Sequence, residues 1–97
     1  MISHQDFNLL VHDVLTKVNK RLEKRRAGIH GVGTIAELES MIRELTQLEK
    51  SVNENNLPPS EQRYLRAAYF VIDAWPPDDS LGKQICDVDY FFRHALG

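Results

Sequence analysis

The chain contains only one cysteine, Cys86, among its 97 residues, so no disulfide can form within it. A small domain without a disulfide framework is typical of a reducing compartment, and we expect a cytoplasmic location. No CxxC or HExxH motif occurs, and the four histidines are scattered, so no metal site is predicted. Asp87 and Asp89 lie close to Cys86, and acidic neighbours raise the pKa of a thiol, which opposes nucleophilic catalysis.

Long apolar runs and an excess of one charge are also missing. The longest uninterrupted apolar stretch, residues 67–72, is too short to span a bilayer, and the N-terminus does not read as a secretory signal. The formal net charge is −2, so the chain as a whole is not an electrostatic binder of nucleic acid. With 42% apolar and 27% charged residues, we expect one folded domain over residues 1–97.

Glycine is scarce except in the segment GIHGVG, residues 28–33, which precedes a predicted helix. A phosphate-binding loop needs Lys and then Ser or Thr after its last glycine, whereas Thr34-Ile35-Ala36 follows here. The segment therefore predicts a flexible connection between helices. Since no other catalytic pattern occurs, we expect neither an enzyme nor a cofactor.

Apolar residues recur at three- and four-residue spacing in four segments, and no segment shows the two-residue alternation of a strand. The first helix is capped by Ser3 and runs to about Arg26, with Gly28 as its stop signal. The second helix starts with a capping box at Thr34 and fades in the Asn-rich residues 53–56.

The third helix is delimited by two proline pairs. Pro58-Pro59 introduces it, and Pro76 stops it because a residue before proline is pushed out of helical geometry. Its residues are apolar on nearly every side, which predicts a central helix covered by the others. Ile72→Asp is accordingly expected to unfold the domain.

A fourth helix follows the second proline pair. Its N-cap is Asp78, Asp79 or Ser80, among which the sequence does not choose. Its buried stripe is predicted to consist of Leu81, Ile85, Val88, Phe92 and either Ala95 or Leu96. The four segments together predict an all-α, four-helix bundle-like domain with short connections.

The turn before the fourth helix gathers carboxylates around the chain's only tryptophan. Tryptophan anchors protein interfaces and carboxylates meet basic partners, so this turn predicts a docking surface for another protein. Its predicted members are Asp73, Trp75, Asp78, Asp79, Asp87, Asp89 and Tyr90. Two alternatives stay open: Trp75 closes the end of the core, and Asp73 is a buried carboxylate that pairs with a helix end or an arginine.

The last turns of the first helix hold half of the chain's 12 basic residues, namely Lys17, Lys20, Arg21, Lys24, Arg25 and Arg26. Such a cluster can contact phosphates, although cations near a helix C-terminus also complement the helix dipole. No aromatic residue lies between them for base stacking. The alternative hypothesis is therefore a small helical adaptor or regulator that contacts nucleic acid through this cluster.

The segments LPPSEQRYL, YFVIDAW and SLGKQICDVDYFFR, within residues 57–93, resemble the small helical immunity proteins of bacterial contact-dependent inhibition and related polymorphic toxin systems. The resemblance implies a cytoplasmic protein that binds the toxin domain of a large secreted effector. Such toxins are often nucleases, whose basic active sites an acidic surface can cover. Our leading hypothesis is thus a non-enzymatic inhibitor that binds one cognate toxin through the acidic turn.

Overall fold

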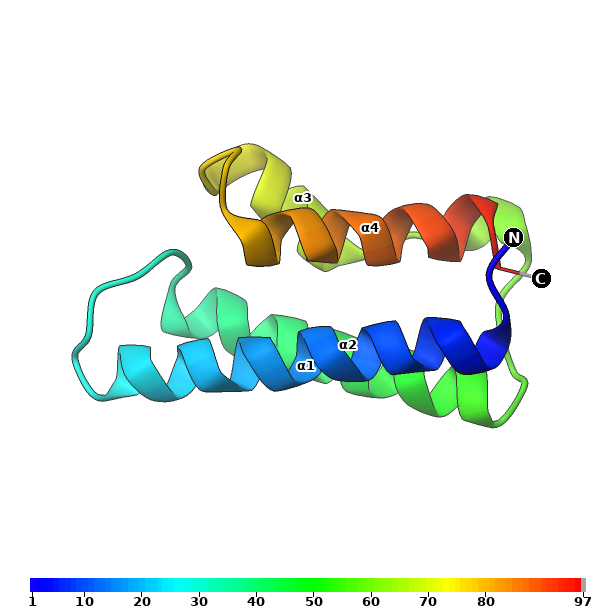
Figure 1. Ribbon diagram of the computed structural model, residues 1–97, viewed down its shortest axis with the longest axis horizontal. Coiled ribbons are helices and arrows are strands. Elements are labelled where there is room, and N and C mark those ends of the chain that lie inside the picture. The colour runs from blue at the N-terminus through cyan, green and yellow to red at the C-terminus, as the bar shows by residue number, and fades with distance from the viewer. Residues whose placement is uncertain (97) are drawn as a thin grey trace.

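The computed structural model describes residues 1–96, which fold into four α-helices and one short 3-10 helix (Figure 1). The elements in chain order are α1 (His4–Arg26), α2 (Ile35–Asn53), η1 (Ser60–Gln62), α3 (Arg66–Ala74) and α4 (Ser80–His94). No strand is present in this part of the chain, and the predicted all-α fold is confirmed.

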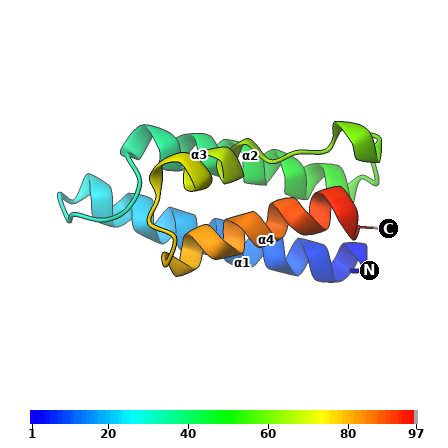
Figure 2. The same ribbon diagram turned by 90° about the horizontal axis from the view of Figure 1, so that it is seen from above.

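The helices pack in two layers. Figure 1 shows α1 and α2 as antiparallel neighbours in one layer and α3 and α4 in a second layer that lies over them. Figure 2 shows the same arrangement from above. The N–H of Ile2 donates to the carbonyl of Ala95 at 2.9 Å, so both ends of the described chain meet at one end of the bundle. The connection 27–34 and the α3–α4 turn lie together at the opposite end.

The ends of α1 and α2 follow the predicted capping signals. The Ser3 hydroxyl accepts from the N–H of Asp6 at 3.0 Å, and Gly28 adopts a left-handed φ of 83° after α1 ends. Thr34 and Glu37 form the reciprocal capping box, with backbone-to-side-chain distances of 2.9 and 3.1 Å. These local hydrogen bonds satisfy backbone donors that a helix start would otherwise leave unpaired.

The third helix starts later and lies farther out than the sequence predicted. The first proline pair leads into η1, and α3 begins only at Arg66. Its buried residues are Ala67, Ala68 and Val71, whereas Ile72 is 71% exposed. The predicted central position is wrong because α3 covers the core with one face only. The expected unfolding by Ile72→Asp therefore loses its basis.

Carboxylates from neighbouring helices determine where α3 begins. Its N-cap residue, Leu65, has no side-chain oxygen, so its own sequence provides no cap. Glu44 of α2 accepts from the N–H groups of Arg66 and Ala67 at 2.6 and 2.8 Å. Asp89 of α4 accepts from the N–H of Leu65 at 2.7 Å. The start of α3 is thus stabilised by tertiary contacts.

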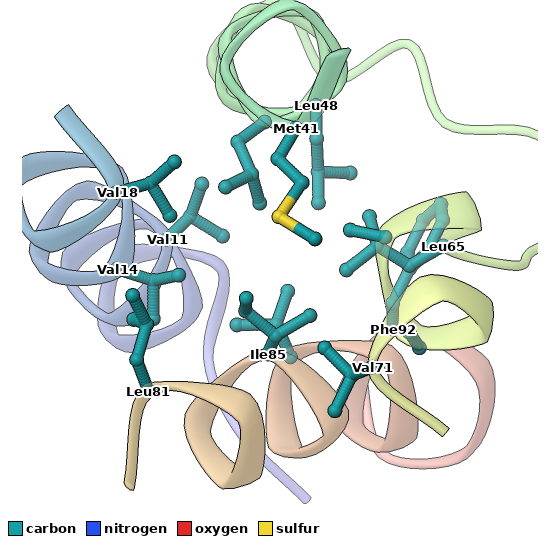
Figure 3. Close-up of a cluster of buried hydrophobic side chains, with 14 of the residues drawn as sticks. Val11, Val14, Val18, Met41, Leu48, Leu65, Val71, Leu81, Ile85 and Phe92 are labelled. Carbon is teal, nitrogen blue, oxygen red and sulfur yellow. The ribbon is translucent and has the colours of Figure 1, made fainter. Parts of the chain in front are cut away.

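All four α-helices contribute to one apolar core, shown in Figure 3. Met41 reaches from α2 toward Ile85 of α4, with valines of α1 beside them. Phe7 and Phe92 stack with ring centroids 6.2 Å apart near the chain ends. The predicted stripe of α4 is buried, and Leu96 rather than Ala95 completes it. Among residues 1–96, no helix has both the length and the hydropathy that crossing a membrane requires.

Candidate functional site

Trp75 belongs to the core and closes the turn end of the bundle. It is 6% exposed, and the Arg21 guanidinium lies 5.3 Å from its ring centroid. A Cβ placed on Gly33 would lie only 2.9 Å from Trp75 Cζ2, so the connection 27–34 packs directly against the indole. The alternative that the sequence left open, a core tryptophan, is therefore the one that the structure adopts.

Asp79 is the N-cap of α4 and also holds α1. Its carboxylate accepts from the N–H of Gly82 at 2.8 Å, which selects Asp79 from the three candidate caps. The same carboxylate accepts two hydrogen bonds from Arg21, at 3.1 and 3.2 Å. A bidentate pair with only 11% of the Asp79 side chain exposed is part of the scaffold beneath the surface.

Asp89 likewise joins α3 to α4. Besides capping Leu65, it accepts from Arg93 Nε at 3.1 Å, and Arg93 donates to the Tyr69 hydroxyl at 3.0 Å. The hydrogen bonds to Tyr69 and Asp89 raise the pKa of Arg93 above its ordinary value. This network fixes the two helices relative to each other.

The other predicted carboxylates lie at the solvent surface. Asp73, Asp78 and Asp87 are exposed, and Tyr90 is 58% exposed. The alternative of a buried Asp73 is wrong because this residue lies on the outer side of α3. Of the seven predicted docking residues, these four remain available to a partner, and the docking surface stays a prediction.

Three exposed apolar or aromatic residues belong to the same region and were missed by the sequence interpretation. They are Ile72, Tyr69 and Tyr64, which are 71%, 49% and 51% exposed. The available signal was that the third segment is apolar on more sides than a peripheral helix can bury. A second apolar face on such a helix marks a surface for another molecule.

A hollow of about 470 Å³ lies between α3 and α4, beside the proline turn that joins them. Its walls are mostly apolar and comprise Val71, Ile72, Trp75, Pro76, Pro77, Gly82, Lys83, Cys86 and Asp87. Tyr69 lies one helical turn before Ile72, and Tyr90 one turn after Cys86 and Asp87, so both extend this region. We call the outer side of α3, the proline turn and α4 the α3–α4 face.

Cys86 lines this hollow but is poorly suited to nucleophilic chemistry. Partial burial raises the pKa of its thiol above the ordinary value, and Asp89 and Asp87 raise it further. The thiol is therefore largely protonated near neutral pH. Among residues 1–96, no group of three His, Cys, Asp or Glu side chains is arranged to hold a metal ion.

Five of the six basic residues predicted as a cluster line a second hollow, of about 490 Å³. It lies between α1, the connection 27–34 and the first turn of α4, and we call it the basic hollow. Its lining residues are Lys17, Lys20, Arg21, Lys24, Arg25, Ile29, His30, Gly31, Val32, Ser80, Leu81 and Gln84. Arg26 does not line it and instead pairs with Glu39 at 2.6 Å.

No protein-family model matches this sequence, and neither curated proteins nor solved structures provide a match.

Proposed function

We propose that this chain is a non-enzymatic interaction protein that binds one basic protein partner through the α3–α4 face. In the form that the sequence resemblance favours, it is a cytoplasmic immunity-type inhibitor, and the partner is a toxin domain, such as a nuclease. The observation that carries the proposal is an exposed apolar and aromatic surface with solvent-facing carboxylates beside it.

The apolar part of the α3–α4 face has the composition of a protein interface. All three tyrosines of the chain lie in α3, α4 or just before α3, and each is 49–58% exposed. Ile72, at 71% exposed, stands at the rim of the apolar hollow. Tyrosine combines a large contact area with a polar hydroxyl and is enriched where proteins bind one another. These side chains supply the apolar contact area that a partner would bury.

The charged residues of the face favour a partner with a positively charged surface. Asp73 and Asp78 are exposed beside the proline turn, and Asp87 lines the hollow together with Lys83. An excess of carboxylates raises the association rate of a positively charged protein. A nuclease active site is positively charged because it holds phosphates, so an acidic face can cover it without any catalysis.

The three residues of the predicted docking set that are not exposed would then act as positioning residues. Asp79 ties the start of α4 to Arg21, and Asp89 ties α4 to the start of α3. Trp75 packs beneath the proline turn and lines the hollow. A face held by such contacts loses little conformational entropy on binding. Substitution of these three residues would disturb the scaffold, so they are unsuited to a test of binding.

The test of the proposal is toxin neutralisation with an altered face. Affinity capture from the native host, followed by mass spectrometry, is expected to recover a C-terminal fragment of a very large secreted protein. That fragment should arrest growth when expressed alone, and co-expression of this chain should restore growth. The variant Asp73→Lys/Asp78→Lys should weaken the complex at least about tenfold, because two attractive charges become repulsive.

The matched control places the same change in charge at the opposite end of the bundle. Glu54 and Glu61 are exposed there, after α2 and in η1. Glu54→Lys/Glu61→Lys should neutralise the toxin as well as the unmodified chain does. Full neutralisation by Asp73→Lys/Asp78→Lys, or equal losses in both variants, would contradict the proposed face.

A further inference from the structure

We propose that the basic hollow binds a small phosphorylated molecule of about the size of a nucleotide. This site is separate from the α3–α4 face and does not depend on the proposed inhibitor function. Its walls come from three segments, α1, the connection 27–34 and the start of α4, so it exists only in the folded chain. Three features of the hollow indicate such a ligand: the charge of its lining, an unpaired donor and its shape.

The charge of the lining is unbalanced. Five cationic side chains face the hollow, and its lining contains no carboxylate. Lys17 pairs with Asp13 and Arg21 with Asp79, whereas Lys20, Lys24 and Arg25 form no ion pair within residues 1–96. Like charges held close together repel, and a bound anion would remove that repulsion.

The dipole of α1 does not account for this arrangement. A helix dipole favours cations in the last turn, which explains Lys24, Arg25 and Arg26. Lys17, Lys20 and Arg21 lie one to two turns earlier, beyond the reach of that effect. They face the hollow together with Lys24 and Arg25 of the last turn. The basic residues of α1 are therefore arranged as in an anion-binding site, and the helix dipole explains only those in the last turn.

Arg25 supplies an independent sign of a missing partner. Its Nε is buried and has no hydrogen-bond partner, and its side chain packs against Gly31 of the connection. A buried donor without an acceptor costs free energy, which a turn of the Arg25 side chain toward an anion in the hollow would recover. The phosphate would thus be bound by side chains of α1. This differs from a glycine-loop site, in which backbone N–H groups hold the phosphate.

The shape and the apolar part of the lining indicate the size and body of the ligand. About 490 Å³ lies within the usual range of small-molecule sites. Ile29, Val32 and Leu81 line the hollow beside the cations, so an apolar or flat body can lie next to the charged group. The lining contains no Phe, Tyr or Trp side chain, and His30 is its one ring, so successive bases of a nucleic-acid strand would lack a continuous stacking surface. A single phosphorylated molecule fits these features better than a nucleic acid does.

The protein carries its own reporter for the test. Trp75 is the only tryptophan, and Arg21, which lines the hollow, lies 5.3 Å from its ring centroid. An anion that attracts Arg21 should change the fluorescence of Trp75. Titration of the full chain with ATP at low ionic strength should give saturable binding with one site, confirmed by calorimetry. Added salt should weaken it because these cations face solvent.

Two double variants with the same change in charge test whether ATP binds in the basic hollow. Lys20→Gln/Lys24→Gln removes two exposed cations that have no partner, so the fold should remain and ATP affinity should fall at least about tenfold. Arg43→Gln/Lys50→Gln makes the same change in charge on exposed positions of α2 and should leave ATP affinity unchanged. Inorganic phosphate should bind more weakly than ATP, because it carries less charge and lacks the body that the apolar residues would contact.

Three results would overturn the inference. One is the absence of saturable ATP binding at low salt, and another is an equal loss of affinity in the two variants. The third is tighter binding of oligothymidylates than of ATP, with an affinity that rises with strand length, which would assign the hollow to nucleic acid.

Discussion

At the scale of single residues, two glycines allow the only tryptophan to enter the core. Gly33 has a φ of 92°, and a Cβ there would lie 2.9 Å from Trp75 Cζ2. A Cβ on Gly82 would lie 3.0 Å from Val71 Cγ1 and 3.3 Å from Trp75 Cε3. The indole therefore packs between α4 and the connection 27–34 because both neighbours lack a side chain.

The replacement Gly33→Ala should lower the free energy of unfolding by roughly 2–3 kcal/mol, because it combines a strained φ with overpacking. Gly28→Ala is the matched control, since Gly28 has a similar φ of 83° but nothing within 4 Å of the added Cβ. It should cost only about 1 kcal/mol, the strain alone. Urea denaturation measures both values. Equal losses would mean that the contact of Gly33 with Trp75 has no energetic weight.

At the scale of the element, α3 is a short helix with two apolar faces. Val71 is 8% exposed and faces the core, whereas its neighbour Ile72 is 71% exposed. Only nine residues long, α3 is too short to be stable alone and depends on its caps from Glu44 and Asp89. The outer face is thus presented by a helix whose position the other helices determine.

Substitutions at Val71 and Ile72 test whether α3 buries one apolar face and exposes the other. Ile72→Asp should change the free energy of unfolding by less than about 1 kcal/mol, because the new carboxylate stays in water. Val71→Asp should cost about 3 kcal/mol or more, because it buries an unpaired charge. Thermal and urea unfolding of both variants measure the difference. Unfolding of the Ile72→Asp protein would show that this face is buried in solution.

At the scale of the whole molecule, the small net charge conceals two regions of opposite sign. The basic hollow lies along α1 and the connection 27–34, and the exposed carboxylates lie around the α3–α4 turn. Both regions are at the same end of the bundle, opposite the meeting point of the described chain ends. Arg21 separates them, since it lines the hollow and binds Asp79.

Packing at that end should make unfolding cooperative. Trp75 contacts residues of α1, the connection 27–34 and α4, so its environment depends on the whole bundle. Its fluorescence and the helical circular dichroism signal should therefore follow the same urea transition. A fluorescence change at lower urea than the loss of helix would show that the turn end opens separately.

The sequence determined the features that depend on neighbours along the chain. The caps Ser3 and Thr34, the stop at Gly28 and the break before Pro76 all appear in the structure where the sequence predicted them. The same holds for the buried stripe of α4, because helical spacing alone places those residues on one face. Capping and periodicity act within a few residues, so a single sequence is enough to recognise them.

The tertiary structure alone decided which residues are available for function. Pro58-Pro59 reads as a helix start, yet α3 begins at Arg66, where Glu44 from another helix accepts its first N–H groups. For both Trp75 and Asp73 the sequence left open a buried or an exposed position, and the structure buries Trp75 and exposes Asp73. The basic hollow needs the start of α4 to lie beside α1 and the connection 27–34, which are far from it in the sequence. Burial and cavities depend on contacts between such segments, and no local pattern encodes those contacts.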